Sequence, residues 1–289
     1  MKIKKAIITA ASERQRELPL QTLIVHDSQT KPVLSILIEQ VLLANIEEIC
    51  VVVWPGDEAR YERALQQQLG NVRFVPQSEP RGYGHAVWCA RDFLKGEPFL
   101  HLVGDHLYVN ADGTPPAAQL LELARAEECS VSAVQVTREG LLPYFGAIGG
   151  RRVAGPRPTY RVETVLEKPT PTEAERKLQI AGLRSGYYLC FFGMHVFTPA
   201  VIDLLERQAA ADPGAAMSLS TALSDLARQE QYLALETRHH RYDIGERYGL
   251  LTAQLALALH GPDRAEILAQ LVELLATQEV GAGAGDDGR

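Results

Sequence analysis

The chain has 289 residues, of which 46% are hydrophobic and 22% are charged, an ordinary balance for a globular protein with a sizeable core. Its formal net charge of -7 argues against a nucleic-acid partner, because proteins that bind nucleic acids usually carry a basic surface. No apolar run is long enough to cross a membrane, and the four cysteines are too scattered for a metal cluster or a disulfide framework. These features favour a reducing cytoplasm.

The first half of the chain alternates short apolar runs with helical patterns. Strands are expected at residues 6–9, 49–54, 72–75 and 98–103, and helices from residue 31, over 58–69 and over 85–93. This alternation predicts right-handed βαβ units and a parallel sheet with helices on both faces. Ligands of such sheets bind beyond the carboxyl ends of the strands.

The second half is less regular. Strands are expected at residues 129–136, 144–148, 160–167, 187–192 and 232–235, and helices at 199–208, 218–230, 246–259 and from 262 to near 277. Residues 144–148 and 160–167 are predicted to pair around a turn rich in glycine and proline. One domain over residues 1–280 and a disordered tail over 281–289 are expected. The eight histidines show no metal-binding or nucleophile–base spacing and are interpreted as loop and surface residues.

The most informative motif covers residues 77–87 and reads QSEPRGYGHAV. Two glycines flank one residue at a turn into a helix, so the backbone can lie against a flat ring, and the amide of Gln77 suits the edge of a uracil. An ordinary glycine-bearing loop is the alternative. The motif resembles that of the bacterial-type UTP–glucose-1-phosphate uridylyltransferases, which are sugar-phosphate nucleotidyltransferases, and the resemblance covers about residues 4–259. It implies that Gln77 and Gly82 hold the base.

Two aspartates stand where carboxylates could meet. Asp105 follows the strand at 98–103, and Asp243 precedes the helix at 246–259. An aspartate at a strand end can hold a hard cation against phosphate oxygens, although each residue could also simply close a turn or cap a helix. The family binds magnesium with aspartates at these two places, so the resemblance implies Mg²⁺ held by Asp105 and Asp243. His106 replaces a second acid of the family, which makes the site less negative.

A Glu-Lys-Pro sequence ends the strand at 160–167. Glu167 and Lys168 alone would be interpreted as a surface ion pair. In the family the glutamate contacts the hexose and the lysine contacts its phosphate, so the resemblance implies that Glu167 and Lys168 bind the sugar phosphate. Gly146 matches a family glycine beside the sugar. The implied catalytic residues are Lys168, Asp105 and Asp243.

The loop after the first strand departs from the family. Ala10 and Ala11 remain, and the resemblance implies that they meet the base. However, the chain has no glycine before Gly56 and no lysine between Lys5 and Lys31. Glycine-rich loops cradle phosphates with backbone N–H groups, and the loss of one preorganised donor typically slows a reaction roughly 10²- to 10³-fold. The loop therefore predicts impaired turnover, with Arg14 and Arg16 as candidates to replace the lost positive charge.

The resemblance implies a Rossmann-like α/β fold of the nucleotide-diphospho-sugar transferase type, with a mixed, mostly parallel sheet, helices on both faces and a small β lobe beside the sugar. It implies that UTP and glucose 1-phosphate become UDP-glucose and pyrophosphate, without a nucleic-acid or membrane partner. Assembly into a homo-oligomer is a further possibility that the sequence leaves open. One alternative is an inactive pseudoenzyme that binds a nucleotide sugar or regulates a paralogue. The other is a transferase of another nucleotide or sugar, for which Phe145 and Tyr187 leave room.

Overall fold

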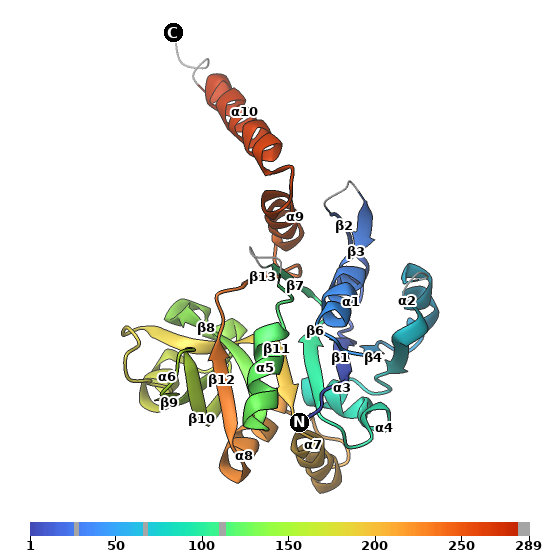
Figure 1. The fold of residues 1–289 in the computed structure, drawn as a ribbon, viewed down its shortest axis with the longest axis vertical. Coiled ribbons are helices and arrows are strands. Elements are labelled where there is room, and N and C mark those ends of the chain that lie inside the picture. The colour runs from blue at the N-terminus through green and yellow to red at the C-terminus, as the bar shows by residue number, and fades with distance from the viewer. Residues whose placement is uncertain (26–28, 66–68, 110–113, 283–289) are drawn as a thin grey trace.

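The structure, a computed structural model, describes residues 1–25, 29–65, 69–109 and 114–282. Within these residues the largest sheet has nine strands in the order β5-β4-β1-β6-β11-β8-β12-β10-β9 (Figure 1). The strands are β1 (Lys5–Ala10), β4 (Glu48–Val53), β5 (Val72–Pro76), β6 (Phe99–Val103), β8 (Ser130–Arg138), β9 (Gly146–Val153), β10 (Thr159–Glu167), β11 (Tyr187–Phe197) and β12 (Tyr232–Glu236). The sheet is mixed, as predicted, because β11 runs antiparallel to β6 and β8.

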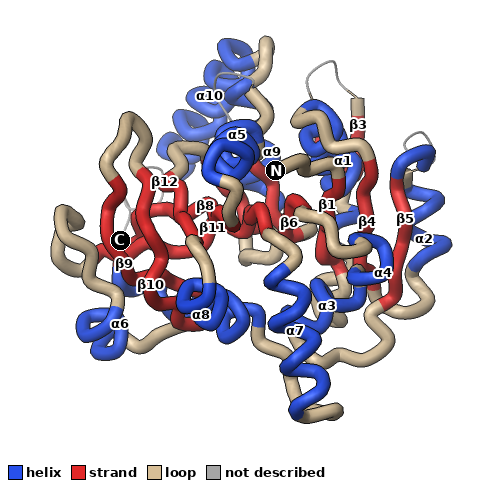
Figure 2. The backbone as a smooth tube through the Cα atoms, turned by 60° about the horizontal axis from the view of Figure 1, so that its bottom comes forward, coloured by secondary structure: helices blue, strands red, loops and turns tan. Residues whose placement is uncertain are grey.

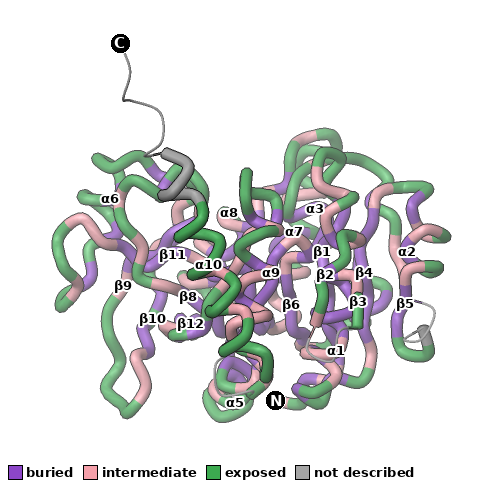
Figure 3. Tube along the Cα trace, turned by 90° about the horizontal axis from the view of Figure 1, so that it is seen from above, coloured by how far each residue is buried: buried purple, intermediate pink, exposed green. Residues whose placement is uncertain are grey.

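Helices cover both faces of this sheet (Figure 2). One face packs against α1 (Val33–Leu43), α2 (Glu58–Ala64), α5 (Ala118–Glu127) and α9 (Gly249–His260), and the other against α3 (Tyr83–Cys89), α4 (Arg91–Leu94), α7 (Ala200–Ala211) and α8 (Leu219–Gln229). Strand alternation explains the two cores: Ala6 and Ile8 of β1 face the first, and Ile7 faces the second. The buried strands lie inside a rim of exposed helix and loop surface (Figure 3).

The carboxyl ends of the parallel strands meet at one edge of the sheet. Ala10 pairs with Val53, and Val53 pairs with Pro76 on the next strand. The backbone N–H of Gln77 then donates to the Val53 carbonyl at 2.9 Å. The residue after β5 is thereby fixed next to the ends of β1 and β4, where a parallel sheet places its ligands.

The other half of the sheet forms a curled β lobe. The predicted pairing of residues 144–148 with 160–167 is confirmed, since β9 and β10 run antiparallel from Gly146 opposite Glu167. β9 also pairs with β11 through Leu189 and Cys190, so the lobe folds back on itself. The short helix α6 (Pro171–Lys177) follows β10, and its Thr170 and Glu173 form a capping box.

Two short sheets complete the described strands. β2 (Thr22–Ile24) pairs with β3 (Thr30–Pro32), and β7 (His106–Val109) pairs with β13 (His240–Asp243). Neither β7 nor β13 was expected. Their antiparallel register places Asp243 opposite His106, so two segments far apart in sequence meet at the carboxyl end of β6.

Several predicted boundaries are wrong. The helix expected from residue 31 begins at Val33 because residues 30–32 pair with β2, and the helix expected over 85–93 is divided into α3 and α4 at Ala90. α2 ends at Ala64, and α9 begins at Gly249 after the turn that follows β13. The last helix, α10 (Arg264–Ala282), extends past residue 277, and residues 283–289 of the expected tail lie outside the described residues.

The interpretation of the histidines as loop and surface residues is wrong for five of them, whereas His240 and His260 are exposed as expected and His26 lies outside the described residues. His85, His101, His106, His195 and His239 are buried, and His101 pairs with His195 across β6 and β11. Nδ1 of His195 pairs with Oγ of Ser132, whereas Nδ1 of His101 and Nδ1 of His106 have no hydrogen-bond partner among the described residues, and periodicity alone reveals neither arrangement.

The C-terminal helix α10 extends away from the body of the molecule and packs against α9 (Figure 1). It carries exposed apolar residues, among them Leu268, Val272 and Leu275. None of the described helices is both long and apolar enough to cross a membrane.

Candidate functional site

A cavity of about 360 Å³ lies at the carboxyl edge of the sheet, and we call it the base-side cavity. It brings together all four residues expected to bind the nucleotide. Its lining comprises Thr9, Ala10, Ala11, Ser12, Glu13, Gln15, Pro19, Trp54, Gln77, Pro80, Gly82, Tyr83, Ala86, Val103 and Asp105. The cavity is mostly apolar with a few polar groups at its rim, as ligand sites usually are.

Gln77 is held in a fixed orientation in this cavity. Its Nε2 donates to the Gly82 carbonyl at 3.0 Å and lies 3.1 Å from Nδ1 of His85. Gly82 has a φ of 93°, which glycine adopts without strain, and it is the N-cap residue of α3. The loop is therefore closed by its own glutamine, whose side-chain oxygen makes none of these bonds and is left for a ligand.

A second cavity of about 300 Å³ adjoins the first, and we call it the hexose-side cavity. It contains all three residues expected to bind the sugar phosphate. Its lining comprises Tyr83, Val103, His106, Tyr144, Phe145, Gly146, Glu167, Lys168, Phe191, Gly193, His195, Leu219, Ser220, Leu223 and Arg241. Tyr83 and Val103 line both cavities, so the two spaces share a wall.

Glu167 and Lys168 stand at the end of β10. Oε2 of Glu167 accepts a hydrogen bond from Oγ of Ser220 at 2.5 Å, which ties β10 to α8. Lys168 has a φ of 45°, in the left-handed region, and its N–H donates to the Phe145 carbonyl at 3.1 Å. A side chain on Gly146 would come within 3.0 Å of Oε2 of Glu167, so the glycine lets the strand pass close to this carboxylate. The predicted ion-pair alternative for Glu167 and Lys168 has no support, since no such pair forms in the described structure.

Asp105 and Asp243 lie on either side of His106. Nδ1 of His106 is 3.9 Å from Oδ1 of Asp105, and its Nε2 is 3.6 Å from Oδ2 of Asp243. Burial raises the pKa of Asp105, and the charge of Asp243 adds to that rise while His106 opposes it. Burial acts on Asp243 in the same direction, but His106 and the Gly245 N–H stabilise its carboxylate and hold its pKa below the ordinary value. His106 therefore lies between the two carboxylates, within 4 Å of each.

The two carboxylates fit a divalent cation. Oδ1 of Asp105 is buried and makes no hydrogen bond within the described residues, so it is an orphaned hard acceptor. The described part of the chain arranges no set of three His, Cys, Asp or Glu residues around one point. Magnesium is usually held by one or two carboxylates together with water and substrate phosphates, so two carboxylates suffice.

The glycine-free first loop is tied to α2, and neither Arg14 nor Arg16 lines the base-side cavity. Nη1 of Arg16 is 3.6 Å from Oδ2 of Asp57, and the Arg16 carbonyl accepts from the Tyr61 hydroxyl at 2.8 Å. Arg14 is exposed and does not line the cavity, whereas Glu13 does. The expectation that Arg14 and Arg16 replace the lost charge has no support from this arrangement.

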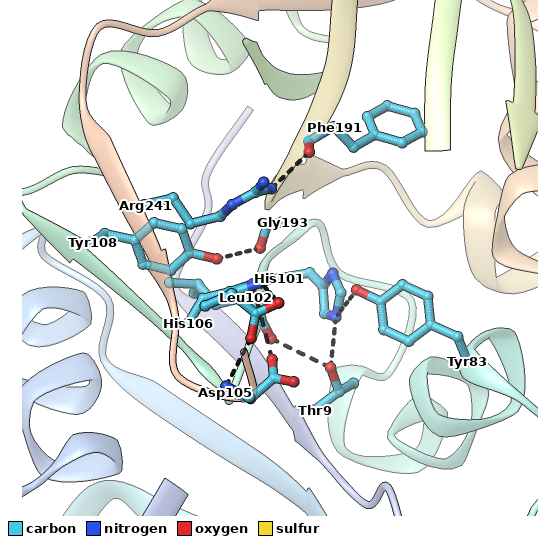
Figure 4. A network of polar contacts seen from close by, with 12 residues as sticks. Thr9, Tyr83, His101, Leu102, Asp105, His106, Tyr108, Phe191, Gly193 and Arg241 are labelled. Carbon is cyan, nitrogen blue, oxygen red and sulfur yellow. Dashed lines mark hydrogen bonds and ion pairs between the residues drawn. The ribbon is translucent and has the colours of Figure 1, made fainter. Parts of the chain in front are cut away.

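Arg241 is a candidate that the sequence motifs did not reveal (Figure 4). It lies on β13 two residues before Asp243, on the same side of the strand. Its Nη1 donates to the Phe191 carbonyl at 2.9 Å, and its guanidinium lies 4.2 Å from the ring centre of Phe145. Burial lowers its pKa, but an arginine stays charged, so it adds a fixed positive charge to the hexose-side cavity. The four-residue strand that places it was not expected, so no local signal in the sequence would have found it.

Residues 16–259 match the family model described as Nucleotidyl transferase. The UTP–glucose-1-phosphate uridylyltransferase of Bacillus subtilis (strain 168) is 30% identical over 304 residues, which cover 96% of this chain and 99% of that protein. The enzyme of that name from Streptococcus pyogenes is 30% identical over 299 residues, 92% of either chain. The chain belongs to this nucleotidyltransferase family.

The architecture agrees with solved nucleotidyltransferase structures. A UDP-glucose pyrophosphorylase complexed with UDP-glucose superposes with a TM-score of 0.70 at 22% identity, over 88% of this chain and 98% of that one. The UDP-glucose pyrophosphorylase of Acinetobacter baumannii gives a TM-score of 0.73 at 20% identity, over 95% and 100% of the two chains. The resemblance and the Rossmann-like α/β fold that the sequence implied are thus confirmed.

Proposed function

We propose that this nucleotidyltransferase converts UTP and glucose 1-phosphate to UDP-glucose and pyrophosphate. One observation carries the proposal: the base-side and hexose-side cavities share the wall formed by Tyr83 and Val103. A nucleotide base in the first cavity and a hexose in the second would be joined by phosphates passing Asp105 and His106. The names of the B. subtilis and S. pyogenes relatives support the same reaction.

In this proposal, the chain acts mainly by positioning its two substrates. Gln77, Gly82 and the backbone at Ala10 and Ala11 hold the base, while Glu167 binds hexose hydroxyls. Lys168 holds the sugar phosphate. A phosphate oxygen of the sugar then attacks the α-phosphorus of UTP, a new P–O bond forms, and the bond to pyrophosphate breaks. Such a transfer depends on alignment and on positive charge around the phosphates more than on covalent help from protein groups.

Asp105 and Asp243 are the proposed ligands of Mg²⁺, and the bound ion would neutralise phosphate charge. The orphaned buried oxygen of Asp105 supports this assignment. We also propose a cytoplasmic location, which is supported by the free thiols of Cys50, Cys89, Cys129 and Cys190.

A second candidate function is nucleotide-sugar binding without turnover, in which the chain acts as a binding or regulatory protein. It is favoured by the first loop, where Glu13 faces the base-side cavity and Arg16 pairs with Asp57. This arrangement disfavours the binding of a triphosphate but leaves the proposed contacts to the base, the hexose and the sugar phosphate in place.

Pyrophosphate release from UTP and glucose 1-phosphate in the presence of Mg²⁺ separates the two functions. A rate above background that Asp105→Asn abolishes supports the enzyme, and no release above background overturns it. Calorimetry then tests the binding protein, which should bind UDP-glucose more tightly than UTP. Tighter binding of UTP contradicts that second function.

A further inference from the structure

His195 lies on β11 in the wall of the hexose-side cavity, and none of the sequence motifs includes it. Its exposed fraction is only 3%. Aromatic rings fix its plane, because the ring centres of Phe197, Phe191 and His101 are 5.0, 5.1 and 5.6 Å away. Its Nε2 has no hydrogen-bond partner among the described residues, although the imidazole lines the cavity. Nε2 is therefore the ring nitrogen that remains available to a ligand in this cavity.

The other ring nitrogen belongs to a buried chain of hydrogen bonds. Nδ1 of His195 lies 2.6 Å from Oγ of Ser132, and the same Oγ lies 2.5 Å from the Tyr232 hydroxyl. Ser132 and Tyr232 are both fully buried. Each hydroxyl has one proton to donate, so the direction of the protons along this chain can be worked out.

Each direction leaves one proton without a partner in the described structure, and the two differ in whether that proton is at the cavity or at the fully buried Tyr232. If the Tyr232 hydroxyl donates to Ser132, then Ser132 donates to Nδ1 of His195, and the imidazole proton stands on Nε2. The opposite direction leaves the Tyr232 proton without an acceptor in the described structure, and an orphaned buried donor is costly. Burial keeps the pKa of His195 well below its usual value, so the ring is neutral and carries a single proton. His195 thus presents an N–H to the cavity.

We propose that the Nε2–H of His195 donates a hydrogen bond to an oxygen of the hexose and makes His195 a specificity-determining residue. The inference rests on the proposed function of the site. Glu167 supplies an acceptor from β10, and His195 supplies a donor from β11. Phe191, Leu219 and Leu223 add apolar surface to the same cavity. A hexose that lacks the matching oxygen leaves a buried N–H unpaired, which is how a site rejects a deoxy analogue.

Calorimetry with UDP-glucose and with UDP tests the proposal on the full chain. His195→Phe keeps a flat ring but removes the donor, so UDP-glucose should bind roughly tenfold more weakly while UDP binds as before. His195→Gln keeps an N–H close to the position of Nε2 and should restore most of the affinity. Equal losses for UDP and UDP-glucose, or no loss in His195→Phe, overturn the proposal. A wild-type chain that binds neither ligand overturns the proposed function and this inference together.

Deoxy analogues of UDP-glucose make the test sharper. One of the deoxy analogues should bind the wild type more weakly than UDP-glucose does, by about the factor that His195→Phe costs. The same analogue should bind His195→Phe as tightly as it binds the wild type, because the effects of two groups in contact are not additive. Full additivity at every position contradicts a direct contact.

The proton assignment has its own measurement, which does not depend on a ligand or on the folding of a variant at His195. Two-bond ¹H–¹⁵N correlation spectra of the wild type should show His195 as the Nε2–H tautomer. Tyr232→Phe removes the hydroxyl that fixes this direction and should introduce the Nδ1–H form. A wild-type ring protonated at Nδ1 overturns the proposal.

Discussion

Lys168 is the residue whose side-chain charge should matter most for sugar-phosphate binding. Lys168→Met removes the ammonium at similar length, and hydrogen bonds to charged groups contribute about 1.5–3 kcal/mol, so UDP-glucose should bind roughly 10- to 100-fold more weakly. Lys177→Met on α6 is the matched control, because Lys177 is exposed and lines neither cavity. Calorimetry at fixed salt is the measurement, and equal affinities for the two variants would contradict a phosphate role for Lys168.

Glu13 should weaken triphosphate binding through its charge. Glu13→Gln keeps the shape of the side chain and removes the negative charge from the base-side rim, so UTP should bind more tightly by about 1 kcal/mol, or roughly fivefold. The gain should shrink at high salt, because exposed charges are screened. Glu62→Gln on α2 is the control, since Glu62 is exposed and away from both cavities. A Glu13→Gln effect that is independent of salt would point to a cause other than charge.

At the scale of elements, the base loop depends on a tight contact between α3 and the segment before α8. A side chain on Gly84 would come within 2.7 Å of the Met217 carbonyl and 2.9 Å of Cδ2 of Leu205. Gly84→Ala should therefore destabilise the fold by about 1–3 kcal/mol, as overpacking of a core usually does. Urea unfolding measures this. Gly214→Ala is the control, because its added side chain would meet no described atom within 4 Å.

Elements with a strong pattern were predictable, and those fixed by distant partners were not. The β-branched run of β4 and the apolar spacing of α1 identify a strand and a helix without any tertiary information. The strands β7 and β13 have four residues each and form by pairing with each other, so no local signal marks them. Motifs identified the candidate base and sugar residues, which line two adjoining cavities, and also Asp105 of the first cavity and Asp243 beside His106. His195 and Arg241 belong to no such motif and became visible only through packing.

At the scale of the whole molecule, the buried histidines should make stability sensitive to acid. Burial lowers the pKa of His101 to about 3, and that of His195 also falls. The unfolded chain takes up protons below about pH 6.5 while these folded histidines stay neutral, so stability falls as the pH falls from about 6.5 towards 3. Each such histidine costs about 1.4 kcal/mol per pH unit in that range.

His101→Phe tests this pH dependence, since it removes one of the buried rings whose pKa is lowered. Urea unfolding at about pH 7 and about pH 5.5 should show a loss of stability that is smaller in the variant by about 1.4 kcal/mol. The same loss in both proteins would mean that His101 is protonated in the folded state. The carboxylates affect both proteins alike, so the comparison isolates the ring.

The left-handed backbone of Lys168 has a consequence for protein engineering. A residue with a β-carbon is disfavoured there by about 1–2 kcal/mol, whereas glycine adopts this conformation freely. Stability and ligand binding therefore favour different residues at one position. A laboratory selection for heat resistance alone should enrich Lys168→Gly. The selected protein would be more stable but would lack the lysine side chain in the hexose-side cavity, so any such selection needs a binding screen alongside it.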